Sequence, residues 1–225
     1  MKKYVIVNEI LKKCTKGYHL INSSPINETI WEDINAQIFT SLGIQILFKS
    51  DGSHSSSIGR ISNKSAKYTN RCQTTVDISS YRLTTVCSEK KIGTPVNFIN
   101  EINRRKFFDY YSFIFRDETV EETTSYDWFF IPSNHPLLNP SYYIWEPTIG
   151  KKGKNKDTQI GWNTNEINGC KMSITFSMSS QLWMHIVITE ELKKFVVSTN
   201  TVNNKPKYNY IDLCDKLKEQ EDTDL

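Results

Sequence analysis

The sequence has few alanines, no closely spaced cysteine pair and no long apolar run, and each shortage excludes a class of protein. Only two of the 225 residues are alanine, against 22 lysines, 25 isoleucines and 19 asparagines. This bias is typical of an AT-rich coding genome and predicts nothing about the fold. No run of 18 apolar residues occurs, so no transmembrane helix is predicted. Asn8 and Glu9 interrupt the first apolar run too early for a secretory signal, which favours a cytoplasmic protein.

The cysteines and histidines show no spacing that is typical of disulfides or metal sites. The five cysteines are scattered, and none forms a C-x-x-C pair, so we expect reduced thiols. The four histidines lie far apart in the sequence. Walker, dinucleotide-binding, nucleophile-elbow and zinc-protease motifs are missing, which argues against the enzyme classes that depend on them. A Ser/His/Asp site stays open, although no motif supports one.

The charge is distributed unevenly along the chain. A total of 28 basic and 25 acidic residues gives a formal net charge of +3. Residues 212–225 hold six acidic and two basic residues, so residues 1–211 carry 26 basic and 19 acidic residues, a balance of +7. Such segregation suits a polyanion binder, but a solvated loop and tail explain it equally well. The acidic tail either screens the positive charge of the body or packs on a partner subunit.

The length and the 38% hydrophobic content fit a single domain, residues 1–225, with a buried core. Asn27 is a suitable N-cap for an apolar-periodic helix that Gly43 ends. The order of elements predicts an α/β (α+β) fold, a mixed β-sheet flanked by helices. The other predicted elements are strands at 44–48, 59–68, 74–86, 107–116, 126–131, 172–178 and 182–188, and helices at 96–105, at 190–196 and in the acidic tail.

Polar side chains gather between Asp51 and Arg82, in a polar turn over residues 51–57 and in the two strands that follow it. Alternate residues of a strand share a face, so Asp77 and Ser79 point to the same side. If the two strands pair, Asp77 and Lys64 project from one surface. A carboxylate beside a lysine can hold Mg²⁺, polarise a water molecule and neutralise charge on a phosphate.

A solvated sheet face is the alternative interpretation of the same residues. The ammonium groups of Lys64 and Lys67 are then hydrated, and the Asp77 carboxylate pairs with Arg82 or Arg60. No chemistry follows from that arrangement, and a polar face by itself does not define a function.

Several segments resemble motifs of type II restriction endonucleases. They are Asp-Gly-Ser-His at 51–54, Ser-Asn-Lys-Ser-Ala-Lys at 62–67, Ile-Ser-Ser-Tyr-Arg-Leu-Thr at 78–84, and the segments at 107–118 and 177–183. The order helix, three strands, helix, strand is also similar to the PD-(D/E)xK nuclease core. The resemblance implies a nuclease-like core over about 27–131, DNA-recognition additions over about 132–211, and an acidic tail at 212–225.

The family pattern requires an acid followed by acid-x-Lys, and this chain departs from it. Ser62-Asn63-Lys64 supplies the lysine with serine where the acid is expected, whereas Asp77 is followed by Ser79 where lysine is expected. Either strand, or both together, can carry the catalytic groups. His54 is expected at the scissile phosphate, as a base, or merely solvated in the turn. The resemblance implies Asp77, Lys64, Asp51, Ser79 and His54 as catalytic residues and Asp77, Asp51 and Glu32 as Mg²⁺ ligands.

Basic and amide side chains supply the expected DNA contacts. Lysine and arginine neutralise or clamp phosphates, and asparagine and glutamine amides read adenine edges. Trp145, Trp162 and Trp183 are interpreted as core residues rather than base-stacking residues. The expected DNA contacts are Arg60, Arg71, Arg82, Lys151, Lys152, Lys154, Lys156, Asn163, Asn165 and Gln181.

The resemblance implies a Mg²⁺-dependent endonuclease that cuts double-stranded DNA at a palindrome as a homodimer in the bacterial cytoplasm. The most specific expectation from this resemblance is a recognition site of eight A·T base pairs that is cut to blunt ends. A restriction–modification system pairs such an enzyme functionally with a DNA methyltransferase, which is not expected to bind it. The two alternatives are a non-catalytic sequence-specific DNA-binding protein and a protein-interaction domain with a polar sheet.

Overall fold

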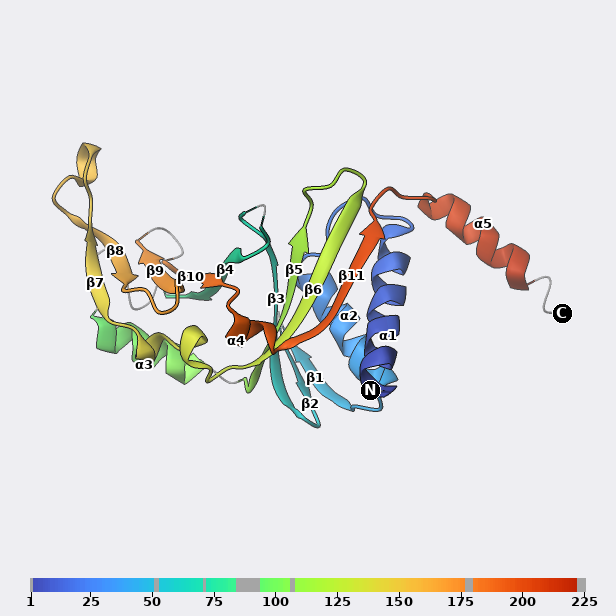
Figure 1. Ribbon diagram of the computed structural model, residues 1–225, viewed down its shortest axis with the longest axis horizontal. Helices are drawn as coiled ribbons and strands as arrows, with labels where there is room; N and C mark the ends of the chain where they lie inside the picture. The colour runs from blue at the N-terminus through green and yellow to red at the C-terminus, as the bar shows by residue number, and fades with distance from the viewer. Residues whose placement is uncertain are drawn as a thin grey trace.

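The computed structural model describes residues 2–50, 53–70, 72–83, 94–105, 108–176 and 180–221 (Figure 1). Their elements are α1 (Lys2–His19), α2 (Glu28–Ser41), β1 (Ile46–Ser50), β2 (Ser53–Ser56), β3 (Gly59–Lys67), β4 (Thr75–Arg82), α3 (Pro95–Arg105), β5 (Tyr110–Asp117), β6 (Thr123–Pro132), the 3₁₀ turns η1 (Pro136–Leu138) and η2 (Pro140–Tyr142), β7 (Trp145–Ile149), the 3₁₀ turn η3 (Gly153–Asn155), β8 (Gln159–Thr164), β9 (Lys171–Thr175), β10 (Gln181–Val187), α4 (Glu190–Lys193), β11 (Val196–Asn203) and α5 (Tyr210–Glu221).

The strands form two sheets. The first, sheet A, has the order β1-β2-β3-β5-β6-β11, and all its neighbours are antiparallel except β3 and β5, which run parallel. The second, sheet B, has the order β4-β10-β9-β8-β7 and is antiparallel throughout. The fold is therefore mixed α+β with helices beside a mixed sheet, as the sequence predicts.

Helix α2 begins and ends where the sequence places its caps. The Asn27 side chain accepts a hydrogen bond of 3.0 Å from the Ile30 N–H, which satisfies an amide that has no partner within the helix. Gly43 follows the helix with φ +76°, a left-handed conformation that glycine adopts without strain. The buried face of α2 presents Trp31 and Ile38 to sheet A.

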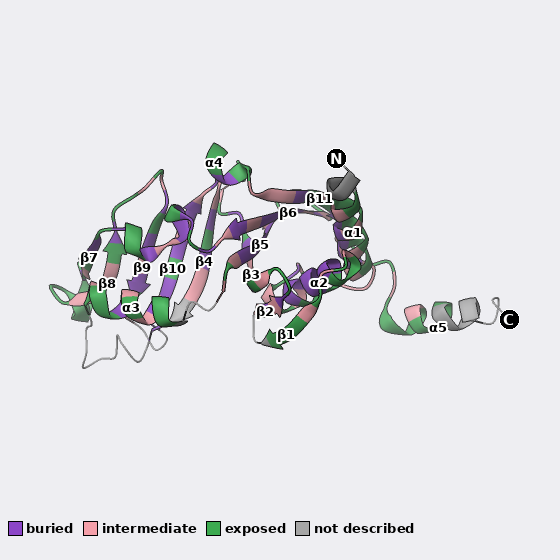
Figure 2. Cartoon of the chain, turned by 90° about the horizontal axis from the view of Figure 1, so that it is seen from below, coloured by how far each residue is buried: buried purple, intermediate pink, exposed green. Residues whose placement is uncertain are grey.

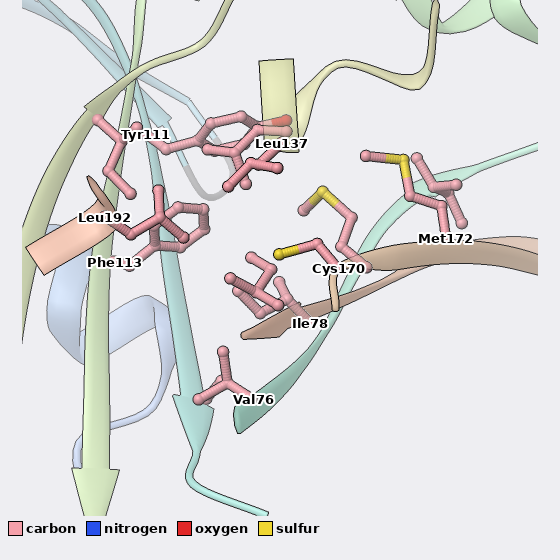
Figure 3. Packing of buried hydrophobic residues seen from close by; sticks show 14 of the residues in the cluster. Val76, Ile78, Tyr111, Phe113, Leu137, Cys170, Met172 and Leu192 are labelled. Atoms are coloured by element: carbon pink, nitrogen blue, oxygen red, sulfur yellow. The ribbon is translucent and has the colours of Figure 1, made fainter. Parts of the chain in front are cut away.

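The central strands of sheet A, β3, β5 and β6, are buried on both faces, because their residues alternate between two cores. On β5, Ile114 joins the core beneath α1 and α2, whereas Phe113 and Phe115 join the core shared with sheet B and α3. Figure 3 shows Phe113 in the shared core with Val76 and Ile78 of β4. Burial of this much aromatic and aliphatic area supplies most of the driving force for folding.

Sheet B buries only one of its faces. On β10, Leu182, Met184 and Ile186 are each 1% exposed, whereas Trp183 between them is 42% exposed. Asp77 on β4 is exposed for the same reason, since its neighbours Val76 and Ile78 point into the core. The loop between β7 and β8 and helix α5 are the exposed extremities of the molecule (Figure 2).

Several sequence expectations are corrected by this fold. Residues 53–56, expected in a polar turn, form β2 and pair with β3. The sequence also gives no prediction for α1 as a full helix, nor for β7, β8 and β11. Cys14, Cys72, Cys170 and Cys214 are free, and Cys87 lies outside the described residues. Within the described residues, no helix combines the length and the apolar character needed to cross a membrane.

Candidate functional site

The structure divides the predicted site residues between the two sheets. Asp77 and Lys64 are expected on one surface only if strands 59–68 and 74–86 pair, and this condition is not met, because β3 lies in sheet A and β4 pairs with β10 in sheet B. Tyr68 and Val76 form an isolated bridge where the chain passes from one sheet to the other. Asp77 and Lys64 therefore do not share a strand-to-strand surface.

Lys64 lies in a different sheet from Asp77, and its ammonium group is held in an ion pair. Its Nζ lies 2.6 Å from Glu28 Oε1 at the start of α2, and its side chain is 16% exposed. Strand β2 pairs with β3 only over residues 59–62, so the edge of β3 next to Lys64 is not paired with β2. The ion pair between strand and helix neutralises a partly buried ammonium group, which would be costly to bury alone.

His54 lies in the protein interior and not in a solvated turn. Its Nδ1 is 3.0 Å from Asn63 Nδ2, Asn35 donates to Asn63 Oδ1 at 2.6 Å, and Asn35 also donates to Ser112 Oγ at 2.8 Å. His54 is 2% exposed, and both asparagines are fully buried. Burial, with a smaller contribution from Lys49, lowers the pKa of His54 to about 4. At neutral pH the ring is therefore an uncharged member of a buried hydrogen-bond network.

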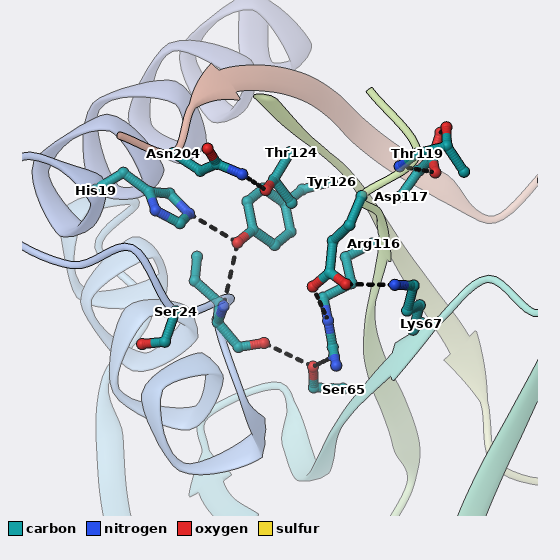
Figure 4. Close-up of polar contacts among 12 residues, drawn as sticks. His19, Ser24, Ser65, Lys67, Arg116, Asp117, Thr119, Thr124, Tyr126 and Asn204 are labelled. Atoms are coloured by element: carbon teal, nitrogen blue, oxygen red, sulfur yellow. Dashed lines mark hydrogen bonds and ion pairs between the residues drawn. The ribbon is translucent and has the colours of Figure 1, made fainter. Parts of the chain in front are cut away.

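An ion-pair cluster closes the ends of β3 and β5 (Figure 4). Glu118 accepts from Lys67 at 2.6 Å and from Arg116 at 3.0 Å, and Arg116 also donates to Ser65 Oγ at 3.0 Å. Burial alone would raise the pKa of Glu118, but the bonds from Lys67 and Arg116 outweigh it and lower the pKa. Glu118 therefore has a structural role, because its carboxylate holds the side chains of Lys67 and Arg116 in place.

Two carboxylates near this cluster have pKa values shifted in opposite directions. Burial raises the pKa of Asp127, although the hydrogen bond of 2.7 Å from Tyr68 opposes the shift. Burial acts the same way on Asp117, but hydrogen bonds from Thr119 and Gln73 outweigh it and lower the pKa. Both carboxylates already have hydrogen-bond donors, so we assign them to the structure of the sheet end.

The open face of sheet B carries the second group of predicted residues. A groove of about 570 Å³ runs across it. In the strand register, Asp77 is opposite His185, and Ser79 is opposite Trp183. The groove is lined by Asp77, Asn163, Thr164, Glu166, Lys171, Met172, Ser173, Thr175, Trp183 and His185.

Hydrogen bonds orient two of the predicted residues in this groove. Asp77 Oδ1 lies 2.7 Å from His185 Nδ1, so a histidine is its partner among the described side chains. Thr148 donates to Asn163 Oδ1 at 2.7 Å, which leaves the Asn163 NH₂ group to donate elsewhere.

Trp183 is the residue that sequence reasoning missed. Its interpretation as a core residue is wrong, whereas Trp145 is 8% exposed and Trp162 packs against the core as expected. The alternation of Leu182, Met184 and Ile186 already contained the signal, because it places residue 183 on the opposite face.

The basic run lies in the hairpin loop between β7 and β8 of the same sheet. Lys151, Lys152, Lys154 and Lys156 are all exposed, and none has an ion pair with another described residue. A Cβ on Gly150 would lie 2.0 Å from the Asn155 carbonyl oxygen, so the tight return of this loop requires glycine. Figure 1 shows the loop extending beyond the sheet.

The remaining predicted DNA contacts are more dispersed. Gln181 lies on β10, and its Nε2 is 3.5 Å from the Ser80 carbonyl oxygen. Asn165 accepts from the Ile144 N–H at 2.9 Å and so holds a turn. Arg60 is an exposed residue of β3 in sheet A.

Of the predicted Mg²⁺ ligands, the two that the structure describes lie in different parts of the fold. Glu32 is buried on α2, and Asp77 lies on the open face of sheet B. Asp51 and Arg71 lie outside the described residues, as does the side chain of Arg82. Among the residues that the structure describes, no group of three His, Cys, Asp or Glu side chains is placed to hold a metal ion.

Comparisons of the chain with protein-family models, with curated proteins and with solved structures found no match.

Proposed function

We propose that this chain is a site-specific endonuclease of double-stranded DNA and that sheet B binds the DNA. One observation carries the proposal. Segments around residues 77, 151–156, 163 and 181 are far apart in sequence, yet all of them lie on sheet B or on its hairpin. Phosphate-binding lysines and base-reading amides are the two kinds of contact that specific DNA binding needs.

Two further observations support cleavage. The motifs that resemble type II restriction endonucleases cover the β2–β3 hairpin and β4. Along sheet A, α2 precedes the antiparallel strands β1, β2 and β3, and a connection through α3 brings β5 parallel to β3. This order is similar to the helix, three strands, helix and strand that the resemblance implies, although the predicted third strand, β4, lies in sheet B and β2 takes part in sheet A in its place. Mg²⁺ is the cofactor that the resemblance implies, but no ligand set is proposed because the described acids do not converge.

Helix α5 supports the proposal of a homodimer. It extends away from the body in Figure 1, and Tyr210 and Ile211 are 65% and 74% exposed. An acidic helix that stands clear of the body fits packing on a partner subunit better than screening of its own chain. A dimer would match a palindromic site, in a bacterial cytoplasmic restriction–modification system with its separate methyltransferase.

A non-catalytic sequence-specific DNA-binding protein is the second candidate function. The lack of a three-residue metal cluster among the described residues favours it, while the DNA-binding surface is the same in both proposals.

Incubation with long mixed-sequence DNA separates the two candidates. The endonuclease gives discrete fragments with Mg²⁺ and a gel shift without cutting in Ca²⁺ or EDTA. The DNA-binding protein gives the gel shift in all three conditions, and the absence of both effects rejects both proposals.

Asp77→Asn provides the residue-level test, and Asp33→Asn, an exposed acid paired with Lys49 on the other side of the fold, is its matched control. We expect the first substitution alone to abolish cutting while DNA binding in Ca²⁺ is retained. Equal activity of both variants would remove Asp77 from the catalytic site.

A further inference from the structure

Trp183 is unusual on the open face of sheet B because its neighbours are polar. The register places Ser79 and Ser173 opposite it on the two adjacent strands, and Asn163 lies opposite Ser173 on the next strand. Short hydroxyl side chains on both sides leave the indole accessible at 42% exposure. A large apolar ring in a polar groove of about 570 Å³ is suited to contact a flat ligand.

The groups around the indole offer hydrogen bonds in its neighbourhood. Asn163 lines the groove and accepts from Thr148 through its Oδ1, which leaves its NH₂ group to donate to a ligand. His185 lines the groove as well, and because its Nδ1 is bonded to Asp77, Nε2 is the ring nitrogen that is left to contact a ligand. An apolar platform with an amide donor and a ring nitrogen matches a nucleobase, which has a π-face and both kinds of polar edge.

We propose that Trp183 stacks on a DNA base displaced from its neighbours, and that Asn163 and His185 contact the edge of that base. This inference rests on the proposed function, because the lysines in the loop between β7 and β8 of the same sheet are needed to hold the DNA strand through its phosphates. The donor of Asn163 suits purine N7 or thymine O4. Displacement of a base costs least at a mismatch, where pairing is already weak.

The test compares Trp183→Ala and Trp183→Phe with Phe48→Ala, a control in which another exposed aromatic side chain is removed from β1 of sheet A. The probes are a labelled mixed-sequence duplex, the same duplex with one mismatch, and a deoxynucleoside monophosphate. Dissociation constants are measured in Ca²⁺ over a range of salt concentrations. Stacking on one base is worth about 1–3 kcal/mol, so Trp183→Ala should weaken binding of the mismatched duplex by roughly 5- to 150-fold.

The pattern of effects identifies stacking rather than a general loss of structure. Trp183→Ala should leave the salt dependence of binding unchanged, because stacking releases no counterions, and Trp183→Phe should retain part of the affinity. Wild-type binding of the mismatched duplex should exceed that of the matched duplex, and Trp183→Ala should remove the difference.

Three outcomes overturn the inference. Equal DNA affinity of Trp183→Ala and Phe48→Ala rejects stacking while the proposed function survives. Binding of the monophosphate without binding of DNA assigns the groove to a free nucleotide. Failure of the wild type to bind any of these DNAs rejects the proposed function itself, together with this inference.

Discussion

The two sheets use polar residues in opposite ways. In sheet A, His54 and Asn63 lie beneath α2 in a hydrogen-bonded network that solvent does not reach. In sheet B, Asn163 and His185 lie on an open face beside a groove. The same residue types therefore stabilise the fold in one sheet and are available to a ligand in the other.

This contrast explains the polar residues between Asp51 and Arg82, which are interpreted as catalytic from the sequence. Polar side chains in strands are costly to bury without partners, so the structure has to supply partners for them or expose them. Sheet A offsets much of that cost with internal hydrogen bonds and ion pairs, among them Lys64 with Glu28. The buried Asn35 Oδ1 and His54 Nε2 nevertheless have no hydrogen-bond partner among the described residues. Sheet B leaves its polar side chains exposed, so we expect substitutions there to change binding rather than stability.

The largest effect on stability should come from removing an amide from the buried network. Asn63→Ala removes the partner of His54 Nδ1 and one of the two acceptors of the Asn35 amide, which keeps its bond to Ser112. Each unsatisfied buried group costs about 1–3 kcal/mol, so we expect a loss of about 2–5 kcal/mol. Urea unfolding measures it. The matched substitution on sheet B, Asn163→Ala, should change the free energy of unfolding by less than about 0.5 kcal/mol. Similar losses of unfolding free energy in the two variants would contradict the proposed difference between the two sheets.

The next largest effect should appear as a pH dependence in sheet A. The unfolded chain protonates His54 below its ordinary pKa of 6.5, whereas the folded chain does so only below about 4. The unfolded state therefore binds more protons between pH 6.5 and 4, so stability falls as the pH is lowered through this window, by about 3 kcal/mol at most.

His54→Gln checks this assignment, because glutamine keeps a hydrogen-bonding group and does not titrate. Urea unfolding at pH 7, 5.5 and 4.5 should show a shallower loss of stability in the variant than in the wild type. Identical pH profiles would mean that His54 is not held neutral in the folded protein.

A smaller effect, confined to DNA binding, should come from the hairpin of sheet B. Lys154→Ala removes one exposed phosphate contact, so affinity should fall to a similar extent for all DNA sequences and the salt slope should decrease by about one. Fluorescence anisotropy at several salt concentrations measures both. A loss restricted to one sequence would show instead that Lys154 reads a base.

The smallest effect on the fold should come from α5, outside both sheets. Ile211→Asp alters a side chain that is 74% exposed, so the free energy of unfolding should change by less than about 0.5 kcal/mol. Sedimentation in the absence of DNA should nevertheless show the wild type as a dimer and the variant shifted towards monomer. A dimer of unchanged strength would place the interface elsewhere.

Local signals in the sequence predict much of the secondary structure. Asn27, Gly43 and the apolar period between them predict α2, the β-branched run at 74–86 predicts β4, and β3 and β10 also lie close to their predicted bounds. The alternation along β4 correctly separates Asp77 from the buried Val76 and Ile78. These features depend on residues that are close together in the chain, so they can be predicted from a single sequence.

The pairing of strands depends on distant residues and could not be predicted in the same way. Nothing near Asp77 indicates that β4 leaves the hairpin of β2 and β3 to pair with β10, more than a hundred residues later. The serine-rich β2 has a weak strand propensity and is held by its pairing with β3. Individual residues of the candidate site could therefore be predicted from the sequence, but which of them lie together could not, because that depends on the pairing of distant strands.

Oxidative footprinting of exposed aromatic side chains, with and without DNA, tests most directly whether sheet B binds DNA. Trp183 on sheet B and Phe48 on sheet A are 42% and 64% exposed, so both should be oxidised in the free protein. If the open face of sheet B binds DNA, the complex should protect Trp183 and leave Phe48 as reactive as before. Protection of Phe48 with Trp183 unchanged would contradict the account.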